Sequence, residues 1–282
     1  MRVEPEPDPQ PFELDSDGAL LSGEASGAGA AVLLLHGLTA TRRYVVHGSR
    51  ALQAGGCGVI SYDARGHGES RPAPAPDAYA YPLLAADALA VLDAARVERA
   101  VLVGSSMGAA TATAVALQHP ERGGALVLVT PAHLGRPAQD LARWDALSDG
   151  LRRGGVEGFL AAYGRPRVPE RNVAAVETVI RQRLSRHRHP GAVADALRFV
   201  PRSAAFDGLD ALRRIAVPTL IVASRDELDP DHPIAVAVEY ERLIPGARLI
   251  VEDEGTTPLA WRGSALSAAV LDVVAGLIAT SE

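Results

Sequence analysis

The sequence predicts an α/β protein with a mostly parallel central sheet of about eight strands, helices on both faces and an all-helical insertion. Three observations support this. Short, strongly apolar runs such as residues 30–35, 101–103 and 125–129 alternate with helical patterns, which is typical of buried parallel strands. The segment from residue 135 to 214 contains helical patterns and no strand pattern. At residues 101–113, a strand pattern leads through a G-x-S-x-G turn directly into a helical pattern.

Taken in order, the chain divides into four parts. Residues 1–10 are acidic and rich in Pro, so we expect a flexible N-terminus. Residues 11–134 and 215–282 form the predicted core, with a hairpin turn at Asp17-Gly18, helices over 43–54, 81–95 and 265–278, and further strands over 58–62, 219–223 and 248–251. Residues 135–214 form the predicted helical cap.

Composition excludes several classes of function. The 282 residues, 48% hydrophobic and 22% charged, are enough for a large core, and the net charge of −6 argues against nucleic-acid binding. The single Cys57 rules out an internal disulfide and fits a reducing compartment. With no secretory pattern at the N-terminus and no apolar run of 18 residues, we expect a cytoplasmic protein that does not cross a membrane.

The basic residues are unevenly distributed. All 28 are Arg, and residues 136–214 hold 15 of them against 9 acidic residues. The simpler interpretation is a basic cap on an acidic core. The alternative is that the cap attracts an anionic small-molecule substrate into the cleft below it.

Residues 101–113, VLVGSSMGAATAT, carry the clearest chemical motif. A tight turn between strand and helix forces its central residue, Ser106, into a strained backbone conformation, so the flanking positions must be small. The strain lifts the Ser106 hydroxyl above the sheet and directs the first helix amides toward it. This arrangement suits a nucleophilic serine.

With HG at His36-Gly37, GHGES at residues 66–70, GSSMG at 104–108 and SRDELDP at 224–230, in this order, the chain resembles the α/β-hydrolase superfamily, in its branch with a helical cap. The resemblance implies that Ser106 is the nucleophile. It also implies that the backbone amides of Leu38 and Met107 form the oxyanion hole and that Asp226, after an apolar strand, is the acid. A helix cap is the alternative role for Asp226, although Asp229 and Asp231 suit that role better.

The pattern fails where the resemblance places the histidine. Relatives have a Gly-His pair after the next strand, but here Thr256 stands at that position, and no His follows His232. Threonine cannot accept a proton at neutral pH, so Ser106 lacks its usual base. Loss of the histidine of a triad costs roughly 10⁶ in turnover.

Another histidine could replace it, and His133 is the best candidate. It follows the strand ending at residue 129, and the carboxyl ends of such strands collect active-site groups. Alternatively, His133 is an inert polar residue at the start of the cap. His187 and His189 could descend from the cap, whereas His232 is expected to order the start of a helix.

The sequence therefore predicts a serine hydrolase of an ester, thioester, lactone or carbon–carbon bond beside a carbonyl, with an atypical or absent base. The alternatives are a non-hydrolytic small-molecule-binding protein, or a variant whose histidine was replaced by Thr. No cofactor is expected, and no metal site, because the pair His187 and His189 lacks a third partner. Candidate pocket residues, which could equally pack between cap helices, are Trp144, Phe159, Tyr163, Leu184 and Phe199. The sequence does not indicate an oligomeric state.

Overall fold

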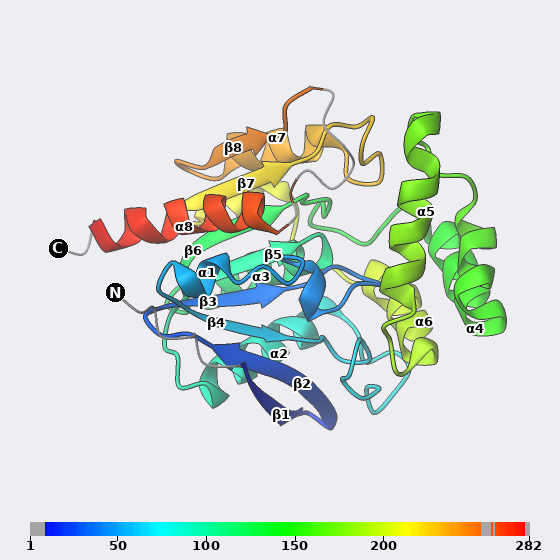
Figure 1. Cartoon of the computed structure of the whole chain (residues 1–282), viewed down its shortest axis with the longest axis horizontal. Helices are drawn as coiled ribbons and strands as arrows, with labels where there is room; N and C mark the ends of the chain where they lie inside the picture. Colours follow the sequence, from blue (N-terminus) through cyan, green and yellow to red (C-terminus); the bar gives the residue numbers. More distant parts are fainter. Residues whose placement is uncertain (1–8, 255–260, 262, 280–282) are drawn as a thin grey trace.

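The computed structural model of the protein describes residues 9–254, 261 and 263–279. An eight-stranded sheet in the order β1-β2-β4-β3-β5-β6-β7-β8 runs through its centre (Figure 1). Its strands are β1 (Gln10–Ser16), β2 (Ala19–Ser26), β3 (Ala30–Leu35), β4 (Cys57–Tyr62), β5 (Ala100–Ser105), β6 (Gly123–Val129), β7 (Thr219–Ala223) and β8 (Arg248–Val251). The predicted fold class is therefore confirmed.

Strand direction follows from the connections. β1 and β2 form an antiparallel hairpin whose turn residues Asp17 (φ 48°) and Gly18 (φ 76°) both have positive φ, as a two-residue hairpin turn requires. β2 also pairs antiparallel with β4. The six strands β3 to β8 are parallel to one another, because each of β4 to β8 is reached from the preceding strand through a crossover. Their carboxyl ends therefore meet at one edge of the sheet.

Helices cover both faces of the sheet (Figure 1). On one face lie α1 (Ala51–Ala54) and α8 (Ser264–Ala279), and on the other lie α2 (Tyr81–Ala94), α3 (Met107–Gln118) and α7 (Ile234–Leu243). Along β3, Val32 and Leu34 pack toward α8, whereas Leu33 and Leu35 pack toward α2 and α3. Because both faces are buried, the strand reads as one continuous apolar run.

The helix expected over residues 43–54 is mostly absent. A short 3-10 turn, η1 (Arg42–Tyr44), and the single helical turn of α1 replace it. His47 and Gly48, with φ values of 48° and 74°, separate the two. Positive φ is incompatible with a right-handed helix, so the chain turns at this point.

The segment between β6 and β7 forms three longer helices at the carboxyl edge of the sheet: α4 (Leu141–Tyr163), α5 (Glu170–Leu184) and α6 (Pro190–Phe199) (Figure 1). The 3-10 turns η2 (Val200–Arg202) and η3 (Leu209–Arg214) lead back to β7. These helices have an apolar cluster of their own, which includes Leu147, Phe159, Ile180 and Leu197. They are the helices predicted for the cap.

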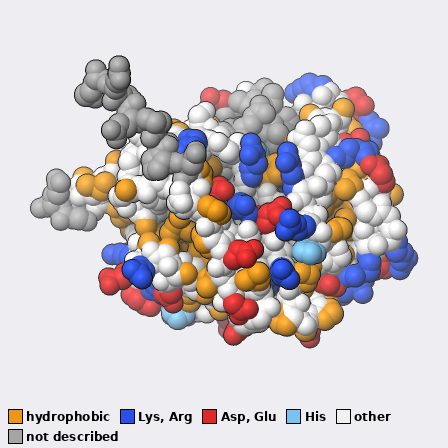
Figure 2. Space-filling view, turned by 60° about the horizontal axis from the view of Figure 1, so that its bottom comes forward, with side chains coloured by type: hydrophobic (Ala, Val, Ile, Leu, Met, Phe, Trp, Pro, Cys, Tyr) orange, Lys and Arg blue, Asp and Glu red, His pale blue; other side chains and the backbone are white. Residues whose placement is uncertain are grey.

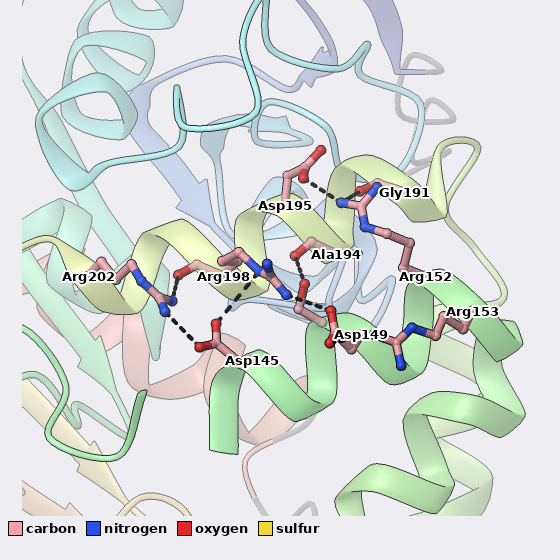
Figure 3. Close-up of polar contacts among 10 residues, drawn as sticks. Asp145, Asp149, Arg152, Arg153, Gly191, Ala194, Asp195, Arg198 and Arg202 are labelled. Atoms are coloured by element: carbon pink, nitrogen blue, oxygen red, sulfur yellow. Dashed lines mark hydrogen bonds and ion pairs between the residues drawn. The ribbon is translucent and has the colours of Figure 1, made fainter. Parts of the chain in front are cut away.

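Ion pairs connect α4 with α6 and with the turn η2 that follows it (Figure 3). Arg202 pairs with Asp145 at 2.8 Å, Arg198 pairs with Asp149, and Arg152 pairs with Asp195. The Ser148 hydroxyl also donates a hydrogen bond to the carbonyl of Ala194. Much of the positive charge of these helices is therefore balanced locally. Basic and acidic side chains are accordingly interspersed over this part of the surface (Figure 2).

Candidate active site

Ser106 lies at the turn between β5 and α3. Its backbone has φ 52° and ψ −109°, a conformation that residues other than Gly rarely adopt. The Ser106 amide donates a hydrogen bond to the carbonyl of Val129 on the neighbouring strand, which holds the turn against the sheet. The strained strand–turn–helix geometry expected of this segment is thus observed.

The two glycines of the motif are required by close backbone contacts. A Cβ atom on Gly104 would lie 2.2 Å from the carbonyl oxygen of Gly108, and one on Gly108 would lie 2.1 Å from that of Leu35. Such distances are far inside van der Waals contact, so neither position accepts a side chain without backbone movement. The glycines therefore let α3 begin directly behind the turn.

A chain of two hydrogen bonds links Ser106 to His232 and Asp229. His232 Nε2 lies 2.9 Å from Ser106 Oγ, and His232 Nδ1 lies 2.8 Å from each Asp229 carboxylate oxygen. A carboxylate only accepts hydrogen bonds, so Nδ1 carries the proton and donates it to Asp229. Nε2 is then free to accept the hydrogen bond of the Ser106 hydroxyl.

The environment of His232 raises its pKa. Burial alone would lower the pKa, but the negative charge of Asp229 and the hydrogen bond to it outweigh burial. Asp231 acts in the same direction, whereas Arg183 opposes it. The imidazolium form is therefore stabilised, as a proton acceptor beside a serine requires.

Asp226, the expected acid, forms its hydrogen bond with the start of α7 and not with a histidine. Its carboxylate is exposed and accepts a hydrogen bond from the amide of Ile234 at 2.8 Å, at the start of α7. Asp226 therefore satisfies the first amide of α7, whose N-cap residue is Pro233, and Asp229 is the carboxylate that contacts a histidine. This differs from the sequence-based expectation, because the loop after β7 turns Asp229, and not Asp226, toward His232.

Asp231, in the same loop, attaches the loop to the helices above it. Its carboxylate accepts hydrogen bonds from the Tyr163 hydroxyl at 2.7 Å, Arg143 at 2.9 Å and Arg167 at 3.1 Å. Burial would raise the pKa of Asp231, but these three donors lower it overall. Asp231 is therefore held as a carboxylate and is fully engaged.

His133, the expected substitute base, is not brought to Ser106. Its Nε2 accepts a hydrogen bond from the amide of Ala205 at 3.0 Å, and its ring packs between Tyr81 and Phe206. Burial lowers the pKa of His133 to about 4. These contacts correspond to the inert alternative, because the chain after β6 turns away from the elbow toward α2.

The turn after β3 is fixed by His36. His36 Nε2 accepts a hydrogen bond from the Ala64 amide at 2.9 Å, so its Nδ1 carries the proton and donates to the Gly37 carbonyl at 2.8 Å. A Cβ atom on Gly37 would lie 3.4 Å from that of Ser106, so this turn lies against the elbow. Leu38 follows in the turn and Met107 begins α3.

His187 connects the helical insertion to this turn. It accepts a hydrogen bond from the Gly68 amide at 2.9 Å through Nδ1 and donates one to the Thr39 carbonyl at 3.0 Å through Nε2. Burial lowers the pKa of His187 to about 4. His187 is thus a neutral structural bridge and does not reach Ser106.

A cavity of about 360 Å³ opens beside Ser106. His232, Asp229 and Leu38 line it from the core, and apolar and charged side chains from α4 and α5 line it from above. Of the pocket residues expected from the sequence, Trp144, Phe159 and Tyr163 line this cavity. Leu184 instead belongs to the apolar cluster between the helices, and Phe199 packs against the main core.

Three further expectations concern Thr256, a metal site and membrane-spanning helices. Thr256 lies outside the described residues. Within the described part of the chain, no group of three or more His, Cys, Asp or Glu is placed to hold a metal ion. None of the helices in that part combines the length and the apolar character needed to cross a bilayer.

Sequence reasoning missed His232 and Asp229 as partners of Ser106. A signal was present in the printed sequence, because DELDPDH places a histidine three residues after a carboxylate at the carboxyl end of a core strand.

Comparison with known proteins identifies the family of the chain. Residues 30–259 match the model of the alpha/beta hydrolase fold family. An esterase from Thermogutta terrifontis has 26% identity and a TM-score of 0.77, with 95% of this chain and 99% of the esterase covered. A hydrolase from Pseudomonas aeruginosa PA01, also 26% identical, has a TM-score of 0.73 over 94% of this chain and 98% of that one.

The sn-1-specific diacylglycerol lipase ABHD11 of Xenopus tropicalis is 38% identical over 99 residues, which is 35% of this chain. That match spans 30% of the lipase, less than a third of its length. Because the family model matches most of the chain, the protein belongs to the alpha/beta hydrolase fold family.

Proposed function

We propose that the protein is a serine hydrolase that cleaves a carboxylic ester, thioester, lactone or carbon–carbon bond beside a carbonyl. The observation that supports this most strongly is the hydrogen-bonded series Ser106–His232–Asp229 at the wall of a cavity. It has the order of contacts found in catalytic triads: nucleophile, base and orienting carboxylate. The base in this proposal comes from the loop after β7, in place of the position at which Thr256 stands in the sequence.

Acylation follows from these contacts. The Ser106 hydroxyl oxygen attacks the substrate carbonyl while His232 Nε2 takes its proton, and Asp229 stabilises the resulting imidazolium. The negative charge that develops on the carbonyl oxygen is stabilised by the backbone amides of Leu38 and Met107. The C–O bond of the ester then breaks, and the leaving alkoxide takes the proton from His232.

Deacylation uses the same groups. Water loses a proton to His232 Nε2 and attacks the acyl carbonyl, and the bond to Ser106 breaks. Ser106 recovers its proton from His232, and the carboxylic acid leaves. Each proton therefore moves through one nitrogen, whose orientation Asp229 maintains.

We further propose that residues 135–214 act as a cap over a core formed by 11–134 and 215–282. The three helices of that segment supply one wall of the cavity. Esterase and lipase relatives support the choice of acyl hydrolysis. The alternative of a non-hydrolytic binding protein depended on the absence of a base, and His232 beside Ser106 removes that reason.

The test is hydrolysis of short p-nitrophenyl esters by the wild type and three variants. We expect Ser106→Ala and His232→Gln to lower turnover by roughly 10⁶, toward the residual rate that the oxyanion hole and substrate binding provide. His133→Gln, which keeps an acceptor for the Ala205 amide, is the matched control and retains activity. Equal rates in wild type and Ser106→Ala contradict the serine mechanism. Full activity in His232→Gln contradicts only the choice of base.

A further inference from the structure

Most of the cavity wall formed by the cap helices is apolar. It is lined by side chains that share an aliphatic or aromatic character: Trp144, Leu147, Phe159, Val176, Val179 and Ile180. Two arginines, Arg143 and Arg183, interrupt this surface. Their states differ, because Arg143 is paired with Asp231 at 2.9 Å.

Arg183, near the C-terminal end of α5, has no such partner among the residues that the structure describes. No hydrogen bond or ion pair joins its guanidinium to any other described residue, and its Nε is enclosed without a hydrogen-bond partner. This contrasts with Arg181 on the same helix, which is exposed and paired with Glu157. An arginine whose donors lack acceptors inside a cavity is costly, so such groups are normally paired.

The nearby carboxylates are already used. Asp229 accepts from His232 through both oxygens, and Asp231 accepts from Arg143, Arg167 and Tyr163. Burial lowers the pKa of Arg183 although Asp229 and Asp231 act in the opposite direction. A guanidinium remains charged at neutral pH even when buried. The described carboxylates beside it are engaged by other donors, so a carboxylate bound in the cavity would give this guanidinium an acceptor.

We propose that Arg183 binds a carboxylate of the substrate, so that the preferred substrate is an ester or lactone with an apolar body and one free carboxylate. A planar guanidinium matches a carboxylate with two parallel hydrogen bonds, which gives orientation as well as affinity. The apolar wall accommodates the intervening carbon chain. This inference rests on the proposed hydrolase function and specifies its substrate class.

The test uses two matched series of methyl esters. One contains the monomethyl esters of dicarboxylic acids from malonate to suberate, and the other contains methyl alkanoates with the same number of acid carbons. The measured quantity is the ratio of kcat/KM for the acidic ester to that for its neutral counterpart. In the wild type we expect this ratio to exceed one at some chain length.

Arg183→Met is expected to lower that ratio about 10- to 100-fold, because a charge-assisted hydrogen-bonded pair is lost. Arg181→Met removes the same charge from the same helix outside the cavity, so it is the matched control and keeps the wild-type ratio. If Arg183→Met keeps the ratio while lowering both rates, Arg183 acts on His232 or on folding, and the inference is wrong. A wild-type ratio below one at every length also contradicts it.

A binding measurement separates this inference from the serine mechanism. Glutarate is added to the Ser106→Ala protein, and the melting temperature is followed. A rise in Tm that disappears in the Ser106→Ala, Arg183→Met double variant supports carboxylate binding even if the hydrolase proposal fails. The same rise in the double variant rejects Arg183 as the anion site.

Discussion

His232 and Ser106 are 126 residues apart in the chain, yet His232 Nε2 lies 2.9 Å from Ser106 Oγ. Ser106 follows β5 and His232 follows β7, with β6 between them in the sheet. Because parallel strands end at the same edge, loops from different strands converge there. A base can therefore reach the elbow from the β7 loop as well as from the β8 loop. The position of Thr256 consequently does not decide whether Ser106 has a base.

Asp229→Asn is expected to lower kcat on the order of 10⁴, because an asparagine no longer enforces a proton on His232 Nδ1. Asp226→Asn changes the neighbouring carboxylate, which accepts from the Ile234 amide, and should retain most activity. Steady-state kinetics on one p-nitrophenyl ester compares the two. A larger loss in Asp226→Asn would assign the acid to Asp226 after all.

Activity is expected to fall as the pH decreases through the pKa of His232, because only the neutral imidazole can accept a proton from Ser106. Since Asp229 and Asp231 outweigh burial and raise this pKa, the acid limb of kcat/KM should lie above the usual histidine value of 6.5. A pH profile on a neutral ester measures it directly. An acid limb well below 6.5 would show that His232 is not the titrating base.

Stability is expected to decrease as the pH falls from 7 to 4.5. His133 and His187 have pKa values of about 4 in the folded protein, lower than the 6.5 expected when unfolded. The unfolded chain therefore binds more protons below pH 6.5, and each histidine contributes a loss of about 2–3 kcal/mol by pH 4.5. Urea unfolding at several pH values measures the slope.

His187→Gln isolates the contribution of His187 to the pH dependence of the free energy of unfolding. The glutamine keeps an acceptor and a donor for the Gly68 amide and the Thr39 carbonyl but does not titrate. We expect its free energy of unfolding to depend less steeply on pH than that of the wild type. Identical slopes would mean that protonation of His187 does not oppose folding.

Gly108→Ala is expected to destabilise the protein by more than about 3 kcal/mol and to abolish activity, because the new methyl group would overlap the Leu35 carbonyl. Gly154→Ala is the matched control, since a Cβ atom on Gly154 meets no atom within 4 Å. Gly154 stands directly before the kink of α4 at Gly155 (φ 58°), so this change should have little effect on stability. Thermal unfolding of the two variants compares them, and a stable Gly108→Ala protein would rule out the proposed contact.

Local patterns were sufficient for the strands, the hairpin, the elbow and the three helices between β6 and β7. Most of these depend on interactions among neighbours in the chain, such as apolar runs and the positive φ at Asp17-Gly18. The elbow was recognisable from its motif, although Gly108 is required by a contact with the distant Leu35 carbonyl. The helix expected over 43–54 failed because His47 and Gly48 adopt positive φ, which helical periodicity does not reveal.

The residues around the serine could be assigned only in part from the printed order of amino acids. Composition and motif placed a hydroxyl at the elbow and limited its partners to a few histidines and aspartates. Which of them face Ser106 depends on how the loop after β7 folds back over the sheet edge, and side-chain direction there follows from long-range packing. For the same reason, Asp226 and Asp229, three residues apart and chemically identical, end in different surroundings.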